Sequence, residues 1–385
     1  TKKGTRNAFA DWSGARGLAE DVRRYGAWMR EQAQQRIGHL YPTIRITPEL
    51  IAANASDKSD GGQKDLKNSG LASLQPGQEL TVIAWLWART VKSPTPAFSH
   101  VDVPLASTFI LSSKASKEAY VLPVIEGDSY RFEVRTGTPP AEAKVGTTAG
   151  KRAAFTCLMS GVPIDYKYIR AEGVAGRIGQ RLMAIVAEGQ RGRIYLAPSA
   201  DQIAIAESAK PVWSPEMDLP NNPRDFKTPN YGLTKFGDLF TPRQLVALTT
   251  FSDLVPEVIA NIRADALAAG MAEDGQGLVA GGNGATAYAE AVGVYLGFAI
   301  DRLAMTGNSL VRWNGVGEKA QHCFGRQALP MLWDFAEPNF LADATGSLSA
   351  AIFYSHDPIG WLPANDPGYV LQSDAQTQKL SAHKV

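Results

Sequence analysis

The sequence holds few of the residues on which disulfide frameworks and metal sites depend. Its 385 residues include 2 cysteines and 5 histidines. Cys157 and Cys323 form no Cys-x-x-Cys pair, which excludes a disulfide framework and argues against a zinc ribbon. A single bridge between them stays open, although two buried thiols fit a cytoplasmic protein better. The histidines form no His-x-x-His pair, so we expect no metal site.

Long apolar runs and a strong net charge are absent as well. No stretch approaches the roughly 18 apolar residues that a membrane-spanning helix needs, so no membrane contact is expected. No apolar leader opens the sequence, and we expect both ends to be cuts in a longer chain. The formal net charge of +1 identifies no charged partner. Gly-x-Ser-x-Gly is missing, so a hydrolase nucleophile elbow has no support.

Charge is nevertheless distributed unevenly. Residues 151–200 carry eight Lys or Arg against three Asp or Glu, whereas residues 201–300 carry six against twelve. A basic segment of this kind is compatible with a face that contacts nucleic-acid phosphates. It contains the arginines that we predict to bind DNA, namely Arg170, Arg177, Arg181, Arg191 and Arg193.

Hydrophobic spacing predicts a helix near the start of the chain and strands after it. Residues 12–40 carry apolar residues at spacings of three and four, which is typical of an amphipathic helix. Residues 80–90, "LTVIAWLWART", have the length and composition of a buried strand. Shorter strands are predicted within 107–137. We therefore expect a mainly antiparallel β subdomain over residues 80–198 that includes a basic helix at 177–188.

The second half is predicted to be mainly helical. Thr241 is a candidate N-cap with Pro242 at the first helical position, and the helix is expected to break near Pro256. Residues 369–372 resemble a strand that ends on Asp374. The predicted divisions are an N-terminal helix and polar loop at 1–79, the β subdomain at 80–198, a proline-rich connector at 199–240 and a helical region at 241–385.

The segment "GVAGRIG", residues 173–179, allows three interpretations. Glycines let backbone N–H groups approach an anion at a helix N-terminus, as in nucleotide phosphate loops. The spacing here is Gly-x-x-Gly-x-x-Gly and no clear strand precedes it. A tight turn before a packed helix fits better, and a DNA-phosphate contact helped by the neighbouring arginines is the third possibility.

The segment "SHDPIGW", residues 355–361, has part of the Asp-Pro-Pro-Tyr pattern with which amino-group DNA methyltransferases hold a flipped base. Ile359 replaces the second proline and Gly360 precedes the aromatic residue. A chance turn is therefore the preferred interpretation.

The segment "GRQALPMLWDFAEPN", residues 325–339, follows neither helix nor strand periodicity. It is either the wall of a binding site or a buried loop oriented by an internal ion-pair network. Asp374 is likewise either a ligand of a bound nucleotide or a turn residue. The polar and aromatic side chains that the segment mixes with apolar ones are Arg326, Trp333, Asp334, Glu337 and Asn339.

Five blocks of the sequence together resemble one family, the large bacterial and archaeal adenine-specific DNA methylase-like proteins that carry a conserved domain of unknown function and often lie near phage-defence genes. The blocks occur in order and span the chain from Gly17 to about Asp374. They are "GLAEDVRRYGAWMREQAQQRIGHLYP" (17–42), "VIAWLWARTVKSPTPAF" (82–98), "YIRAEGVAGRIGQRLMAIVAEGQRGRIYL" (168–196), "RDFKTPNYGLTKFGDLFTPRQLVALTTFSDLV" (224–255) and "FGRQALPMLWDFAEPN" (324–339).

The resemblance implies an α/β fold in which part of a Rossmann-like methyltransferase sheet carries a large inserted region of mixed strands and helices. It implies a glycine-rich S-adenosylmethionine loop upstream of Thr1 and an Asp-Pro-Pro-Tyr loop just downstream of this chain. The chain would then hold no catalytic residue. Some relatives carry cysteines after "WARTVK" and form a zinc ribbon, but residues 93–98 here are Ser-Pro-Thr-Pro-Ala-Phe, so zinc binding is not carried over.

The resemblance also suggests roles for the segment that would precede the Asp-Pro-Pro-Tyr loop. Trp333 is expected to stack on a base or on the cofactor adenine. Asp334 and Glu337 would hold an amine or ribose hydroxyls, and Arg326 a phosphate. The implied cofactor contacts are Asp374, Trp333 and Asp334, and the implied DNA contacts in this part of the chain are Arg326, Glu337 and Asn339.

The predicted function is the central portion of an S-adenosylmethionine-dependent methyltransferase that acts on the exocyclic amine of adenine in DNA, as in restriction–modification or phage defence. The chain alone is expected to be inactive. The alternative is a non-enzymatic DNA-binding or scaffold component of a phage-defence complex, with other defence proteins as partners. A nucleotide-handling enzyme that uses residues 173–179 as a phosphate loop is a third hypothesis.

Overall fold

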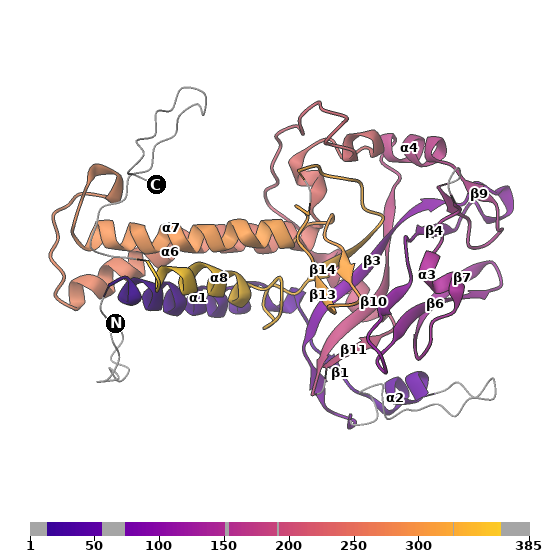
Figure 1. Ribbon diagram of the computed structural model, residues 1–385, viewed down its shortest axis with the longest axis horizontal. Helices are drawn as coiled ribbons and strands as arrows, with labels where there is room; N and C mark the ends of the chain where they lie inside the picture. Colours follow the sequence, from indigo (N-terminus) through magenta and orange to yellow (C-terminus); the bar gives the residue numbers. More distant parts are fainter. Residues whose placement is uncertain (1–13, 56–73, 151–153, 191, 326, 363–385) are drawn as a thin grey trace, which may run out of the picture.

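The computed structural model consists of a helical arm joined to a β body (Figure 1). It describes residues 14–55, 74–150, 154–190, 192–325 and 327–362. Within these residues the fold is mixed α/β, as expected. The arm is formed by α1 Arg16–Ile37, α6 Pro242–Ala268, α7 Ala285–Thr306 and α8 Leu348–Ile359.

The arm helices pack through apolar faces that the sequence repeats every three or four residues. Val22 and Met29 of α1, Phe251 of α6 and Leu296 of α7 are fully buried in one core cluster. Gly26 of α1 lets α8 come close, because a Cβ at this position would lie 2.4 Å from the Ile352 side chain. The predicted first helix is therefore confirmed over most of its length.

The β body is built around a five-stranded antiparallel sheet. Its strand order is β11-β10-β3-β14, and β4 pairs with the far end of β3. The strands are β3 Val82–Lys92, β4 Asp102–Leu105, β10 Gly179–Gly189, β11 Gly192–Leu196 and β14 Asp334–Pro338. Alternate residues of β3 enter different cores: Trp85 and Trp87 face the cluster shared with the arm, whereas Leu86 and Ala88 face the second cluster.

A three-stranded sheet covers that second cluster. It consists of β5 Ile110–Ser112, β6 Ala119–Glu126 and β7 Ser129–Thr136, all antiparallel. These strands confirm the short strands predicted within 107–137. The smaller elements are α2 Pro48–Ala55, α3 Ala141–Val145, α4 Tyr166–Val174, α5 Ala200–Ser208, β1 Ile44–Arg45, β2 Glu79–Leu80, β8 Phe155–Thr156, β9 Pro163–Ile164, β12 Trp313–Asn314, β13 Lys319–Ala320 and the short 3-10 helices η1 Gly38–Leu40, η4 Pro96–Phe98, η5 Thr228–Tyr231, η6 Phe236–Leu239 and η7 Leu278–Ala280.

A buried ion pair joins the arm to the body. Arg243, in the first turn of α6, is 2.6 Å from a carboxylate oxygen of Glu337 on β14, and both side chains are about as buried as apolar core residues. Trp87 Nε1 and Thr241 Oγ1 donate to the same carboxylate at 2.8 and 2.7 Å. The Arg243 guanidinium also donates to the Leu40 carbonyl oxygen, at the end of the first helical segment.

Two sequence-based expectations about secondary structure are wrong. Residues 177–188, expected to be helical, belong largely to strand β10. Leu182, Ile185 and Ala187 face one core and Met183 and Val186 the other, so both faces are buried and the run lacks polar alternation. Periodicity alone cannot separate such a strand from a buried helix.

The other correction concerns α6. The helix begins at the predicted Thr241 cap but continues through Pro256 without the expected break. This helix is also the one element of the described chain that is long and apolar enough to cross a membrane by length and composition. It packs against α1 and α7 in the arm, as the core helix of a bundle does.

The parallel sheet of a Rossmann-like methyltransferase is not found in the described residues. Every strand ladder there is antiparallel, and one isolated bridge, Phe226 to Leu329, is parallel. Residues 369–372, expected to form a strand, lie outside the described residues.

We call this buried network around Arg243 and Glu337 the joint. Its burial predicts a strong energetic coupling between the two residues. Arg243→Met and Glu337→Gln should each destabilise the protein by about 3–5 kcal/mol, because each leaves one buried charge without its partner. The double variant should cost clearly less than the sum of the two, as measured by denaturant unfolding. The exposed pair Arg36–Glu257 is the control and should couple by no more than about 1 kcal/mol. Additive effects at the buried pair would contradict this account of the joint.

Candidate functional site

The segment 325–339 divides into residues with different surroundings. Glu337 and Asn339 are buried and fully engaged. Asn339 donates to the Val82 carbonyl oxygen at 2.7 Å and accepts from the Leu341 N–H at 2.9 Å, which fixes the chain after β14. For these two residues the structure favours the internal-network interpretation over a ligand contact.

The pKa of Glu337 reflects its surroundings. Burial pushes the pKa of this carboxyl upward, but the Arg243 charge and the hydrogen bonds from Arg243, Thr241 and Trp87 outweigh burial and hold the pKa below its ordinary value. The carboxylate is therefore a permanent charge of the joint at neutral pH.

Trp333 and Asp334 have different neighbours at the second core cluster. The Trp333 ring meets the rings of Phe155 and Tyr231 edge to face, with centroids 5.4 and 4.9 Å apart. Its backbone carbonyl accepts from the Arg89 N–H. The Arg89 guanidinium is buried and donates to the carbonyl oxygens of Leu332 and Ser309, so it fixes the backbone just before Trp333.

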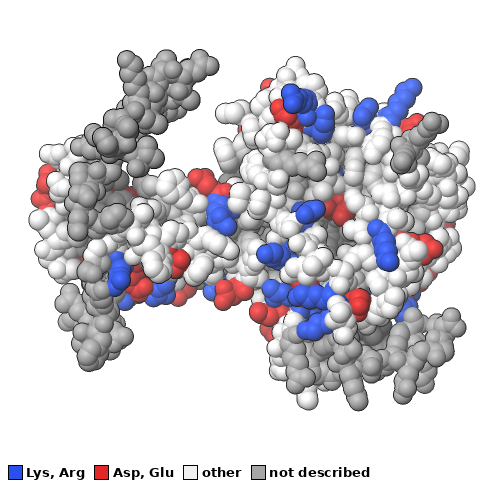
Figure 2. Space-filling model, in the orientation of Figure 1, with Lys and Arg blue, Asp and Glu red and all other residues white. Residues whose placement is uncertain are grey.

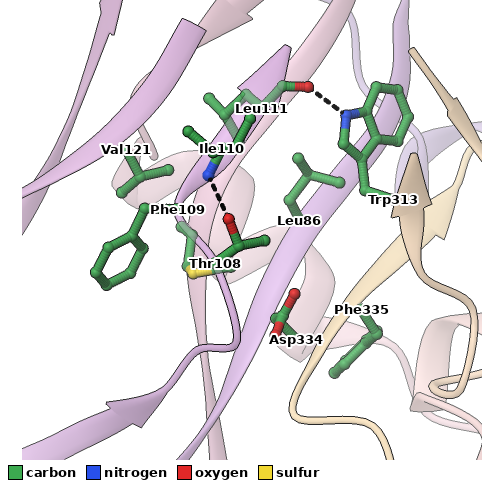
Figure 3. Close-up of a pocket in the computed structure, with 10 residues that line it drawn as sticks. Leu86, Thr108, Phe109, Ile110, Leu111, Val121, Trp313, Asp334 and Phe335 are labelled. Atoms are coloured by element: carbon green, nitrogen blue, oxygen red, sulfur yellow. Dashed lines mark hydrogen bonds between the residues drawn. The ribbon is translucent and has the colours of Figure 1, made fainter. Parts of the chain in front are cut away.

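Asp334 lines a small cavity between β3, β5 and β14 (Figure 3). The cavity volume is about 20 Å³, enough for a water molecule but not for a nucleoside. One carboxylate oxygen of Asp334 accepts from the Ser107 N–H at 2.7 Å. The Trp313 indole closes another side and donates to the Leu111 carbonyl oxygen at 2.7 Å. Asp334 and Thr108 are the polar side chains that face this cavity most directly (Figure 3).

Burial raises the pKa of Asp334 above its ordinary value, against the opposing effect of the Ser107 hydrogen bonds. No cation is paired with this carboxyl in the part of the chain that the structure describes. A half-buried carboxyl with a raised pKa beside a cavity has the character of a functional group that can carry a proton.

The predicted DNA-binding arginines do not form one surface. Arg170 lies 5.7 Å over the Tyr231 ring, and Arg177 makes a two-point ion pair with Glu172. Arg181 lies 4.0 Å over the Tyr130 ring, near the start of β10. Arg193 pairs in register with Glu188, seven residues farther along β10 and so about 23 Å from Arg181.

The glycines of "GVAGRIG" serve packing and a turn. Gly173 lies in the last turn of helix α4, Gly176 lies in the turn that follows and Gly179 begins strand β10, so no helix N-terminus is present for an anion. A Cβ on Gly173 would lie 2.4 Å from the Tyr231 carbonyl oxygen, and Gly176 has φ +70°. The phosphate-loop interpretation is therefore not supported, and the tight turn is confirmed, although a strand and not a helix follows it.

The remaining predicted positions are accounted for briefly. Arg326, Arg191 and Asp374 lie outside the described residues. The "SHDPIGW" segment forms the end of α8, with Pro358 inside the helix, and so has no base-holding loop geometry.

A basic cluster that the sequence did not reveal surrounds the β12–β13 hairpin. Lys319 of this hairpin and Arg193 of β11 line the same small cavity together with Glu318. Lys114, from the turn after β5, is 2.5 Å from a Glu318 carboxylate oxygen. Lys117 of the same turn lies against Gly192. Four cations from three separate segments thus meet at one end of the sheet.

Glu318 organises this cluster. It is 5% exposed and adopts the left-handed φ of +49°, a strained conformation for a residue with a side chain. Lys114 and the Tyr195 hydroxyl hold its carboxylate from two sides. Lys319 is exposed, and no ion pair joins Lys319 or Arg193 to an acidic residue of the described chain.

The cluster has the character of a phosphate-contacting surface. Among the described residues, Lys114 engages Glu318, Glu188 lies opposite Arg193 in the β10–β11 ladder, and Glu118 follows Lys117 in the turn after β5. Figure 2 shows Lys and Arg atoms gathered over this part of the β body, where Figure 1 labels β13. Exposed cations of this kind bind nucleic-acid backbones without regard to sequence.

No group of three or more His, Cys, Asp or Glu that could hold a metal ion occurs among the described residues. Cys157 and Cys323 are free thiols, so the single bridge left open by the sequence is not formed. The Cys157 sulfur lies 3.2 Å from the Ser93 hydroxyl.

The chain matches no family model, and neither a curated protein nor a solved structure was found to be similar to it.

Asp334 predicts an unusual pH dependence of stability. A raised pKa means that the folded state binds the proton more tightly than the unfolded state, so ionisation as the pH rises costs stability. Asp334→Asn keeps an oxygen acceptor for the Ser107 N–H and should melt at a higher temperature than the parent protein at pH 7. The advantage should shrink as the pH falls toward 4.

Thermal unfolding across this pH range tests the prediction. Asp343→Asn serves as the control, because Asp343 is exposed and its replacement should not give a pH-dependent gain. An Asp334→Asn variant that is less stable than the parent at every pH would contradict the assignment.

Proposed function

We propose that this chain is the DNA-positioning central portion of an S-adenosylmethionine-dependent methyltransferase that acts on the exocyclic amine of adenine in DNA. The reaction requires the flipped base and the cofactor methyl group to be aligned in a dry site, more than it requires a strong base. A large insertion that grips the duplex would supply that alignment.

One observation carries the proposal: the blocks that resemble the methylase-like family converge on one joint. Leu40 from the first block, Trp87 from the second, Arg243 from the fourth and Glu337 from the fifth are neighbours in the buried network. The third block supplies β10, which pairs with β3 of the second. These contacts support the proposal because the blocks that carry the resemblance come from distant parts of the sequence and pack together.

The basic cluster supports the DNA-contacting role. Arg193, one of the predicted DNA ligands, lies there with Lys319 and Lys114. We place the Rossmann-like sheet, the glycine-rich cofactor loop and the Asp-Pro-Pro-Tyr loop outside the described residues. In this proposal Asp374 borders the cofactor when the whole enzyme is assembled, Trp333 and Asp334 lie in the packed segment that supports this edge, and the protein works in the cytoplasm.

A second candidate function is favoured by the antiparallel sheet. A non-enzymatic DNA-binding or scaffold component of a defence complex would need the basic cluster but no parallel methyltransferase sheet, and the described strands form none. Its partners would be DNA and other defence proteins.

The DNA-contacting role is tested by salt-dependent binding. Lys319→Ala and Arg193→Ala should each weaken binding to unrelated duplexes to a similar extent. Each should lower the slope of log affinity against log salt concentration by about one, because one phosphate contact is lost. Lys210→Ala, which removes an exposed cation of the connector, is the control and should change neither quantity. Unchanged slopes in both cluster variants would remove this surface from the proposal.

The enzymatic role is tested by methyl transfer. The chain of 385 residues should transfer no labelled methyl group to DNA, whereas the protein extended at both ends should bind S-adenosylmethionine in a calorimetric titration. Trp333→Ala and Asp374→Ala should weaken that binding. Salt-dependent DNA binding without cofactor binding by the extended protein would favour the scaffold function, and methyl transfer by the present chain would contradict our placement of the catalytic loops.

A further inference from the structure

The solvent side of the arm carries an apolar face. Within α7 the exposed residues are Val294, Phe298 and Asp301, spaced by four and three, and the other residues of this helix are buried or half-buried. An amphipathic helix normally presents polar residues along that stripe. In α8 the exposed residues are Phe353, Tyr354, Asp357 and Pro358.

The two helices make this face continuous. They pack side by side in the arm (Figure 1). Arg302, one turn after Phe298, lies 3.9 Å over the Tyr354 ring, and Phe353 meets Tyr354 edge to face. Val294, Phe298, Phe353 and Tyr354 are each 46–57% exposed. An aromatic side chain can bury about 150–250 Å², so the four leave on the order of 400 Å² of apolar surface in water, the size at which patches mark binding sites.

Gly297 lies beside the exposed stripe, and no close contact within the described residues explains a glycine there. A Cβ on Gly293, one turn earlier, would lie 2.6 Å from the Ile259 side chain, so packing against α6 explains that glycine. A Cβ on Gly297 would meet nothing within 4 Å. Glycine is the least favourable non-proline residue in a helix interior, and no contact among the described residues requires it here.

We propose that the α7–α8 face binds a second copy of this chain, with the two α7 helices antiparallel and crossing midway between Gly297 and Phe298. In that arrangement Phe298 of each copy faces Gly297 of the other. Each copy therefore presents an exposed Phe298 ring beside Gly297, a position that has no side chain. A two-fold axis at this point matches the two, as an isologous interface requires.

Charge supports a protein partner over nucleic acid. The exposed positions of α7 and α8 carry Asp301 and Asp357. The half-buried Arg302 lies over the Tyr354 ring, so these two helices present phosphates with two carboxylates and one engaged cation. The apolar area from both copies, about 800 Å² with polar rims in addition, lies at the low end for specific interfaces. The expected dimer is therefore of micromolar affinity.

Sedimentation velocity of the chain tests the proposal over about 1–200 µM, the range that brackets a micromolar dissociation constant. The parent chain should pass from monomer to dimer. Phe298→Asp should raise the dissociation constant about 30-fold or more, as loss of a central anchor does. Val212→Asp is the matched control, because Val212 is 96% exposed in the connector, and this variant should dimerise like the parent.

Gly297→Leu separates association from folding. The first side-chain carbon of leucine meets no described atom within 4 Å, so this variant should lose association while its midpoint of thermal unfolding, measured at low concentration, rises. A parent chain that stays monomeric throughout the range would overturn the proposal. Association that survives in Phe298→Asp or Gly297→Leu would overturn it as well, and would show that another surface is responsible.

Discussion

The structure depends on one buried ion pair. Arg243 and Glu337 are withdrawn from water, and a charge in that position is tolerable only when its partner and hydrogen bonds are complete. The Trp87 indole and the Thr241 hydroxyl donate hydrogen bonds to the Glu337 carboxylate. The Arg243 guanidinium donates to the Leu40 carbonyl oxygen and lies 3.8 Å over the face of the Trp85 ring. Because these partners come from η1, the start of α6, β3 and β14, the pair can form only when arm and body are assembled together.

Strand β14 transmits this constraint to the candidate site. Glu337 faces the joint, and Asp334, three residues earlier, faces the cavity on the opposite side of the sheet. The Ala336 N–H donates to the Val311 carbonyl oxygen at 2.7 Å, immediately before the β12–β13 hairpin that carries Lys319. One short strand therefore ties the joint, the cavity and the basic cluster together. A substitution of Arg243 or Glu337 would therefore alter the position of the β12–β13 hairpin, which carries the surface that we assign to DNA, although the ion pair does not contact that surface.

Local signals in the sequence predicted some elements well and others poorly. The Thr241–Pro242 cap, the first helix and strand β3 follow from residues that act on their immediate neighbours. Strand β10 was predicted as a helix because its two buried faces belong to two cores, and only tertiary pairing with β3 and β11 decides its conformation. Likewise, the mixed character of residues 325–339 predicted either a site wall or an ion-pair network. It did not predict that Glu337 would join the ion-pair network while Asp334 lines a separate cavity.

The basic cluster could not be predicted for the same reason. Lys114, Arg193 and Lys319 are far apart in the sequence, and each is unremarkable in its own segment. What brings them together is the hairpin at the end of the sheet, held by Glu318 in a backbone conformation that no sequence pattern indicates. The predicted arginines, by contrast, were near each other in sequence, and the 11 residues of β10 carry them to opposite ends of the sheet.

The central claim is that DNA lies against this end of the β body. Hydrogen–deuterium exchange of the chain with and without duplex DNA would test it most directly. The account predicts slower exchange in residues 313–320 and 114–118 when DNA is bound, with little change in α7 and α8. Protection confined to the arm, or to residues 166–177 near the glycine turn, would contradict it.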